Sequence, residues 1–286
     1  DMYTMGYDSK PWLNPKAIAD GPSILAYIHE AAQERGIDRH IRFDQRLKSA
    51  AWDSATARWT LEIERPQAGG SDRLSCNLLL MCSGYYSYAQ GHRPSFDGEA
   101  DFTGRLIHPQ HWPQDLDYAG KRVVIIGSGA TAMTLVPAMA NAAAKVTMLQ
   151  RSPTYVVSMP AADPIAALLR KLLPAQLAYR LTRWKNVQFQ RYVYRQTRVK
   201  PEAVKRKLID LVRRALPAGY DVEKHFVPRY MPWDQRLCLV PDEDLFKAIG
   251  AGKAEVVTDE IERFTATGIQ LKLSLIHISE TTRLRR

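Results

Sequence analysis

The order of apolar and polar residues in the first third of the chain predicts one helix and three strands. Residues 22–36 carry apolar side chains at helical spacing, with Ser23 as the expected N-cap and Gly36 as the expected stop. The strand-like stretches are HIRFDQRLKSAAW, RWTLEIER and RLSCNLLLMCSG, of which the second alternates strictly and the third contains a continuous apolar run. This pattern predicts an antiparallel meander that ends in a buried strand, NLLLMC.

The pattern changes at Lys121, where a strand, a glycine-rich turn, a helix and a second strand follow one another. KRVVIIG and KVTMLQRS are typical of buried strands, and TAMTLVPAMANAA between them is typical of a helix. A βαβ unit of this kind predicts a parallel sheet with a right-handed crossover, and therefore an α/β fold. We expect residues 161–216 to be mostly helical and strongly basic, and residues 244–264 to form a helix and two strands.

The turn in KRVVIIGSGATA matches a GxGxxA dinucleotide-binding motif, placed between a strand and a helix as that motif requires. Gly127 allows the tight turn, Gly129 allows a pyrophosphate to approach the backbone, and Ala132 allows close packing of helix on strand. The pyrophosphate would rest on free N–H groups at the start of the helix, and the threonine hydroxyls would add contacts. The predicted cofactor-binding residues are Gly127, Ser128, Gly129, Ala130, Thr131, Ala132, Met133 and Thr134.

The end of the second strand indicates which nicotinamide cofactor the turn would take. NAD-binding folds usually place an acidic residue about 20 positions after the motif, where it holds the ribose 2′-OH. This chain has Gln150, Arg151 and Ser152 there instead. Because an arginine beside a hydroxyl suits a 2′-phosphate, Arg151 and Ser152 predict NADPH rather than NADH; a solvated surface arginine is the alternative.

Composition and net charge limit the partners and the cellular compartment that the sequence predicts. The 286 residues carry a formal net charge of +10, which suits a nucleic acid, an anionic membrane or a phosphorylated cofactor. Leu, Ile and Ala interleave with Arg and Lys in residues 161–216, as on the solvated face of packed helices, so no nucleic-acid partner is expected. Three widely spaced cysteines predict neither a disulfide framework nor a metal site, and favour a reducing, cytoplasmic compartment. Peripheral association with the inner face of a membrane stays open.

A second motif precedes the glycine turn in FTGRLIHPQHWP, residues 102–113. His108 and Trp112 lie four residues apart, but Pro109 and Pro113 argue against a regular helix through them. The sequence therefore predicts a proline-stiffened loop that holds an imidazole and an indole.

This loop resembles the fingerprint FxGxxxHxxxWP of type I Baeyer–Villiger flavin monooxygenases, in which it lies just before the NADPH-binding motif. The matching residues are Phe102, Gly104, His108, Trp112 and Pro113. The resemblance extends from DMYTMGY to IERFTATGI. It implies a flavoprotein with two dinucleotide-binding domains that uses FAD, NADPH and O2. A C4a-peroxyflavin would insert one oxygen into a ketone, giving an ester or lactone, or would oxygenate the sulfur of a thioamide or sulfide.

The resemblance also implies roles for single residues. Arg236, in YMPWDQRLCLVP, matches the catalytic arginine, whereas Gln235 departs from a lysine that contacts the NADPH 2′-phosphate in many relatives. Leu47 stands where the family contacts the FAD adenine through its backbone. His108 and Trp112 would help to couple the movements of the two domains, or would simply brace the linker between them. Cys82 begins a segment expected near the flavin and is expected to be a buried hydrophobe.

The expected organisation is a partial FAD domain (1–101), a fingerprint linker (102–117) and a complete or nearly complete NADPH-binding Rossmann domain (118–272) with a helical insertion (161–216). Residues 273–286 resemble translated sequencing-adapter DNA and are expected to be non-native. Since the family's first GxGxxG is not found, we expect an internal fragment of a longer reading frame that is inactive by itself.

Three other interpretations remain open. One is an N- or S-oxygenating flavin monooxygenase or an NADPH-dependent flavin reductase. Another is a non-catalytic module that binds NADPH or an anionic surface, and the third is an inert remnant. The sequence predicts neither the physiological substrate nor the oligomeric state.

Overall fold

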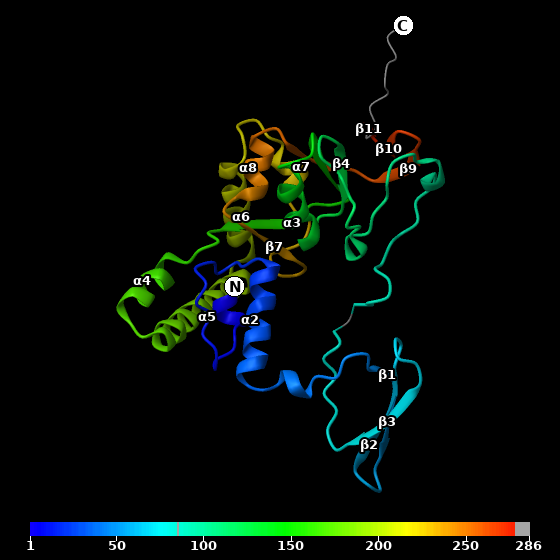
Figure 1. Cartoon of the computed structure of the whole chain (residues 1–286). Helices are drawn as coiled ribbons and strands as arrows, with labels where there is room; N and C mark the ends of the chain where they lie inside the picture. The colour runs from blue at the N-terminus through cyan, green and yellow to red at the C-terminus, as the bar shows by residue number, and fades with distance from the viewer. Residues whose placement is uncertain (85, 278–286) are drawn as a thin grey trace. The chain divides into compact units, whose positions relative to one another are not determined.

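The computed structural model of the chain describes residues 1–84 and 86–277, and these divide into two compact units (Figure 1). One unit comprises residues 20–91, and the other comprises residues 1–19 together with His92 onward. Residues 1–19, expected in the partial FAD domain, pack instead with the helical insertion: Ala17 N donates to Ala161 O at 2.7 Å. The expected boundaries of the two cofactor domains remain predictions.

The unit of residues 20–91 contains one long helix and a three-stranded antiparallel sheet in the order β1-β2-β3. Its elements are α2 (Gly21–Glu34), β1 (Arg46–Asp53), β2 (Arg58–Glu64) and β3 (Ser71–Cys76), with a short 3-10 helix at Asp38–His40. The predicted meander is confirmed. The predicted N-cap, Ser23, is wrong, because Pro22 fits the first turn and the helix begins at Gly21, three residues before the start that a Ser23 cap implies. Asp20 caps it by accepting a hydrogen bond from Ser23 N at 2.9 Å.

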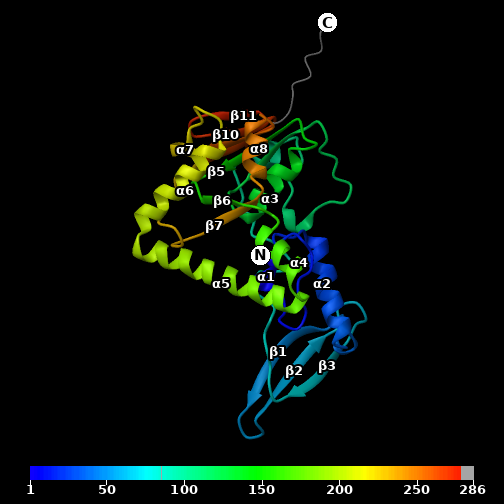
Figure 2. The ribbon, with the colours of Figure 1, turned by 90° about the vertical axis from the view of Figure 1, so that its left-hand side faces the viewer.

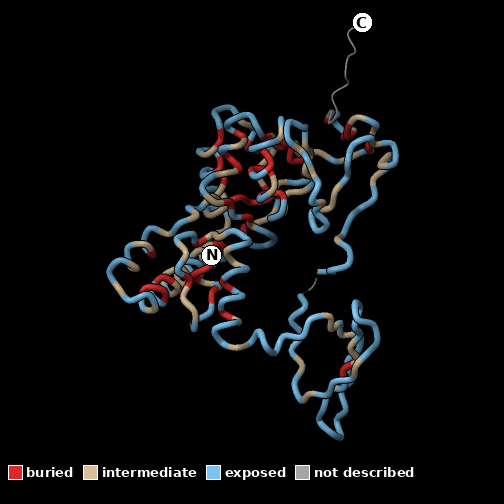
Figure 3. Tube along the Cα trace, in the orientation of Figure 1, coloured by how far each residue is buried: buried red, intermediate tan, exposed pale blue. Residues whose placement is uncertain are grey.

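The predicted buried strand after the meander is wrong. Residues 77–84 form no strand, and Leu78, Leu80 and Met81 are mostly exposed, Leu80 at 76%. Within the described residues β3 ends at Cys76 and pairs only with β2, so no neighbouring strand covers this apolar run. Cys82 is likewise exposed rather than a buried hydrophobe. Figure 3 shows how few residues of this unit are buried.

The other unit is built on the predicted βαβ arrangement. A parallel sheet has the order β4-β5-β8, with Val123 opposite Val146 and Val146 opposite Ala254. Its strands and covering helices are β4 (Arg122–Ile126), α3 (Ala130–Met139), β5 (Lys145–Gln150), α8 (Asp244–Gly250) and β8 (Ala254–Thr258). Val136 and Leu245, one from each helix, are fully buried in the main core.

A helical region and a second small sheet join this α/β core, as Figure 2 shows from the side. The helices are α4 (Pro164–Leu172), α5 (Ala175–Val199), α6 (Pro201–Ala215) and α7 (Val222–Phe226), and the short α1 (Met2–Met5) packs on α5. The first three confirm the helical prediction for residues 161–216. The two-stranded parallel sheet of β6 (Tyr155–Met159) and β7 (Leu237–Pro241) was not predicted, although TYVVSM and LCLVP are short apolar runs typical of strands.

A three-stranded antiparallel sheet completes this unit: β9 (Ile261–Thr265), β10 (Gly268–Leu271) and β11 (Leu275–His277). β11 lies in the segment expected to be non-native; residues 278–286 lie outside the described residues, and the origin of the segment stays a prediction. No helix in the described part of the chain is both long and apolar enough to cross a membrane.

Candidate dinucleotide-binding site

The residues predicted to bind the nicotinamide cofactor meet at one edge of the β4-β5-β8 sheet. Because the three strands are parallel, their carboxyl ends lie at the same edge. The glycine turn that starts at Gly127 follows β4, Arg151 and Ser152 follow β5, and Glu260 lies just beyond β8. Open α/β sheets bind ligands at such an edge, so the tertiary structure brings these residues together where a dinucleotide would lie.

Two hydrogen bonds join the turn to the end of β5. Gly127 has φ +123°, a conformation that favours glycine, and its N–H donates to Leu149 O at 2.7 Å. The Ser128 hydroxyl donates to Ser152 O at 3.4 Å. The turn and the segment with Arg151 are therefore held against each other.

Gly129 is the N-cap of α3, and its missing side chain leaves room for a cation. A Cβ built on Gly129 would lie 2.8 Å from Nη1 of Arg236, closer than real Cβ contacts. The first backbone hydrogen bond of α3 runs from Met133 N to Gly129 O at 3.0 Å. By helix geometry the N–H groups of the residues before Met133 have no partner within the helix, so they suit an anion. This cradle fits a dinucleotide diphosphate.

The other predicted residues of the turn divide between packing and exposure. Ala132 and Met133 are buried in the core that α3 forms with the sheet, so their side chains pack and only their backbone is placed for a cofactor. The Thr134 hydroxyl donates to Ala130 O at 3.1 Å, so its proton is already used within the helix. Ala130 and Thr131 are exposed at the start of α3.

Arg151 is the first exposed side chain after β5. Gln150 before it is buried and donates to His225 O at 2.8 Å and to Thr258 Oγ1 at 2.9 Å, which fixes the end of the strand. Across the edge, Lys272 bonds Glu260 at 2.5 Å and holds the pKa of that carboxyl below its usual value, and Arg151 adds a smaller effect in the same direction. Arg151 therefore lies within the electrostatic field of the Glu260 carboxylate, which already forms an ion pair with Lys272.

Arg236 comes to the site from the loop before β7. Its side chain is exposed, and its carbonyl accepts a hydrogen bond from the Tyr230 hydroxyl at 2.9 Å. Sequence reasoning selected Arg236 only through the resemblance. It missed Tyr230 and the two residues that bond to it, Tyr155 at the start of β6 and Thr154 just before that strand. The only available signal was the apolar run of β6.

The start of the fingerprint is anchored on the β9–β10 hairpin. The Phe102 ring lies edge-on to Phe264, with centroids 5.7 Å apart, and Thr103 N and Oγ1 both donate to Ala266 O. A Cβ on Gly104 would overlap the Phe102 ring. Gly104 is therefore required locally because the chain folds back against its own phenylalanine.

The second half of the fingerprint forms the predicted proline-stiffened turn rather than a regular helix. His108 Nδ1 accepts from Gln110 N at 3.2 Å and caps a 3-10 helix at Pro109–His111. The Trp112 ring lies edge-on to Tyr118, with centroids 6.5 Å apart. Pro113, the last fingerprint position, is half-buried. These contacts brace the segment that enters β4; coupling between domains stays a prediction.

Leu47 lies in the other unit, on β1, opposite Ile63 of β2. A β-bulge separates Leu47 from Ser49, and the Leu47 side chain is half-buried. Its contact with an FAD adenine stays a prediction.

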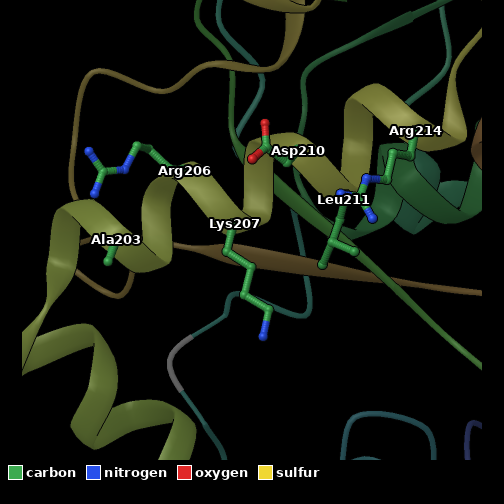
Figure 4. A pocket seen from close by; sticks show the side chains of 6 residues that line it. All are labelled: Ala203, Arg206, Lys207, Asp210, Leu211 and Arg214. Atoms are coloured by element: carbon green, nitrogen blue, oxygen red, sulfur yellow. The ribbon is translucent and has the colours of Figure 1, made fainter.

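Two other features of the described residues do not point to a site. A hollow of about 300 Å³ lies along α6 (Figure 4), and its lining comes from that one helix: Ala203, Arg206, Lys207, Asp210, Leu211 and Arg214. Small-molecule sites are concave and combine groups from several elements, so this surface does not qualify. Within residues 1–84 and 86–277, no group of three or more His, Cys, Asp or Glu side chains is arranged to hold a metal ion.

The chain is similar in sequence to flavin-dependent monooxygenases. The FAD-containing monooxygenase EthA of Mycolicibacterium smegmatis is 54% identical over 272 residues, which are 95% of this chain and 55% of that protein. The putative FAD-containing monooxygenase MymA of Mycobacterium tuberculosis is 48% identical over 276 residues, 95% of this chain and 56% of that protein. The chain thus spans about half the length of the curated relatives it matches.

Solved structures give the same fold. An oxidized steroid monooxygenase bound to NADP superposes with a TM-score of 0.72 at 23% identity, covering 93% of this chain and 57% of that one. The model of the FMO-like family, flavin-binding monooxygenase-like, matches residues 15–200. The match covers more than half of the sequence, and the chain belongs to the flavin-binding monooxygenase-like family.

Proposed function

We propose that this chain belongs to an FAD- and NADPH-dependent monooxygenase that transfers one oxygen atom of O2 to a small-molecule substrate. The favoured substrates are ketones, by Baeyer–Villiger insertion, and the sulfur of thioamides or sulfides. FAD, when bound, supplies the electron transfer and the oxygen activation. The names of the relatives as FAD-containing monooxygenases support this proposal, as does a solved cyclohexanone monooxygenase bound to ε-caprolactone.

One observation carries the proposal: the Arg236 guanidinium and the start of α3 share the surface left open by Gly129. The N–H groups of α3 would bind the diphosphate of NADPH, and Arg151 would hold its 2′-phosphate. Arg236 would touch the bound dinucleotide and stabilise negative charge that develops on oxygen during transfer. Because the Arg236 side chain is exposed beside the turn, it is accessible both to the dinucleotide and to the oxygen on which the charge would develop.

Calorimetric titration of the 286-residue chain with NADPH and with NADH tests this function. The expected result is binding of NADPH with a dissociation constant at least about tenfold below that for NADH. No heat of binding with NADPH, from a chain whose circular dichroism shows it folded, would overturn the proposal. In a preparation that turns over, Arg236→Ala is expected to retain reduction of the flavin by NADPH while losing oxygenation.

The exposed face of α5 favours a second, compatible activity, binding to an anionic membrane surface. α5 contains six Arg or Lys residues and no Asp or Glu. Leu177, Leu181 and Trp184 are exposed and follow each other at spacings of four and three residues, which places them on one face. The buried residues of this part of the helix lie on the opposite side: Ala178, Tyr179 and Thr182. An apolar stripe with an aromatic residue and basic neighbours suits the interface of an anionic bilayer.

Vesicle sedimentation at two salt concentrations tests this second activity. Vesicles with phosphatidylglycerol should pellet the chain at low salt, and neutral phosphatidylcholine vesicles should not. The double variant Leu181→Ala/Trp184→Ala should lose the binding, whereas Leu25→Ala, which truncates an exposed leucine of the other unit, should keep it. Equal pelleting by both kinds of vesicle, or by the double variant, would argue against the α5 face as a membrane surface.

A further inference from the structure

The loop that delivers Arg236 is fastened to the start of β6 by a chain of hydroxyl groups. The Tyr155 hydroxyl donates to Tyr230 O at 2.6 Å, and the Tyr230 hydroxyl donates to Arg236 O at 2.9 Å. Thr154 Oγ1 lies 2.8 Å from the Tyr230 hydroxyl oxygen. A tyrosine has a single hydroxyl proton, and Tyr230 uses it on Arg236; Thr154 is therefore the donor in that pair.

The residues that anchor this series of hydroxyl groups are held in place by packing and by strand pairing. Thr154 and Tyr155 are both buried, Tyr155 with 1% of its surface exposed. β6 pairs in parallel with β7, and Tyr155 stands opposite Leu237, the residue after Arg236. The rings of Tyr155 and Tyr230 meet edge-on with centroids 5.3 Å apart. Burial raises the pKa of Tyr155 to about 12, so its hydroxyl remains a donor at neutral pH.

The other end of the arginine meets the glycine turn. Nη1 of Arg236 lies against Gly129, and two residues further on the buried Cys238 places its sulfur 3.8 Å from Ser128 O. The strand that begins after Arg236 therefore runs beside the turn. A fixed carbonyl at Arg236 restricts where its long, flexible side chain can place the guanidinium.

We propose that Tyr230 is a positioning residue: its hydroxyl fixes the Arg236 carbonyl, and thereby holds the guanidinium at the surface of Gly129 where the dinucleotide binds. This inference rests on the proposed function, in which Arg236 touches the bound NADPH. Tyr230 itself need not contact the cofactor.

A second set of contacts holds the same loop without touching Arg236. On α5, Arg198 forms an ion pair with Asp234 at 3.0 Å and donates to Pro232 O at 3.3 Å, and Tyr194 packs edge-on to Trp233. The loop therefore keeps these anchors when the Tyr230 hydroxyl is removed. Tyr230→Phe preserves the ring and removes only the hydroxyl, with its hydrogen bonds to Arg236 O and Thr154 Oγ1.

A double-mutant cycle on NADPH binding separates positioning from general stabilisation. The affinity of the 286-residue chain is measured by calorimetry for the wild type, Tyr230→Phe, Arg236→Ala and the double variant. Tyr230→Phe should weaken binding about tenfold with Arg236 present and have no further effect with Arg236→Ala. The matched control is Tyr179→Phe, which removes a hydroxyl bonded to Arg183 inside α5 and should leave the affinity unchanged.

The outcomes are distinct. If Tyr230→Phe weakens binding equally in both Arg236 backgrounds, or not at all, the positioning role is refuted while NADPH binding stands. A wild-type chain that does not bind NADPH refutes the proposed function itself. Should Tyr230→Phe fail to fold, Thr154→Val replaces it in the cycle, because it removes the donor that orients the Tyr230 hydroxyl. Thr154→Val is likewise expected to weaken NADPH binding when Arg236 is present and to have no further effect in the Arg236→Ala background.

Discussion

Nη1 of Arg236 lies 2.8 Å from the point that a Cβ on Gly129 would occupy. The glycine thus does more than open the turn: it lets a guanidinium and the first N–H groups of α3 share one surface, which would suit an anion. Gly129 and Arg236 are far apart in sequence, and the parallel pairing of β6 with β7 brings Arg236 close to the turn.

Gly129→Ala should reduce cofactor binding without unfolding the chain. The new methyl group would meet only the flexible end of Arg236, which can move, so the expected loss of stability is about 1 kcal/mol or less. The same methyl would cover the surface a diphosphate must approach, and the dissociation constant for NADPH should rise at least about tenfold. Calorimetry and thermal unfolding measure the two effects. Gly21→Ala, which meets nothing within 4 Å, is the control; an unchanged NADPH affinity in Gly129→Ala would argue against a diphosphate at this turn.

Arg151→Ala should change cofactor preference. Loss of a charge-assisted hydrogen bond to the 2′-phosphate removes about 1.5–3 kcal/mol, so the dissociation constant for NADPH should rise about 10- to 100-fold. NADH lacks that phosphate, and its affinity should not change. Parallel titrations with both cofactors test this, with Arg206→Ala on α6 as a control of equal charge. Equal weakening of both cofactors would exclude Arg151 as the 2′-phosphate ligand.

Gly104→Ala should destabilise the fingerprint segment. The added Cβ would overlap the Phe102 ring, which must then leave its edge-on contact with Phe264. Overpacking of this kind costs about 1–3 kcal/mol, and urea denaturation should detect it as a lower midpoint. In a Phe102→Leu background the same substitution should cost less, because the clashing ring is absent. An unchanged midpoint in the Gly104→Ala chain would contradict this account.

His225 should make stability depend on pH. Burial lowers its pKa from 6.5, Lys224 lowers it further, and Asp221 acts in the opposite direction. As the pH falls below about 6.5 the unfolded chain takes up the proton first, so the free energy of unfolding should fall until the folded pKa is also passed. The midpoint of unfolding, measured across this pH range, should depend less steeply on pH in His225→Gln than in the wild type. A dependence on pH that His225→Gln leaves unchanged would rule out this source.

The elements whose causes are local could be predicted from the sequence. The βαβ unit follows from two apolar runs on either side of a helical segment, and the glycine turn follows because Gly127 must adopt φ +123° there. Pro109 and Pro113 excluded a regular helix in the fingerprint loop, and a 3-10 helix forms instead. These features depend on residues close together in the chain, so periodicity and backbone sterics suffice to predict them.

Which segments meet depends on three-dimensional packing. NLLLMC is as apolar as a buried strand, yet Leu80 is exposed, because hydrophobicity does not specify which neighbour will cover a segment. The N-cap of α2 is Asp20 rather than the predicted Ser23. Either side chain can accept the capping hydrogen bond from the backbone, and the path of the preceding chain selects one of them. The link from Tyr155 through Tyr230 to Arg236 was invisible in the sequence for the same reason. Long-range contacts require chain segments brought together by packing, and a linear pattern does not record that geometry.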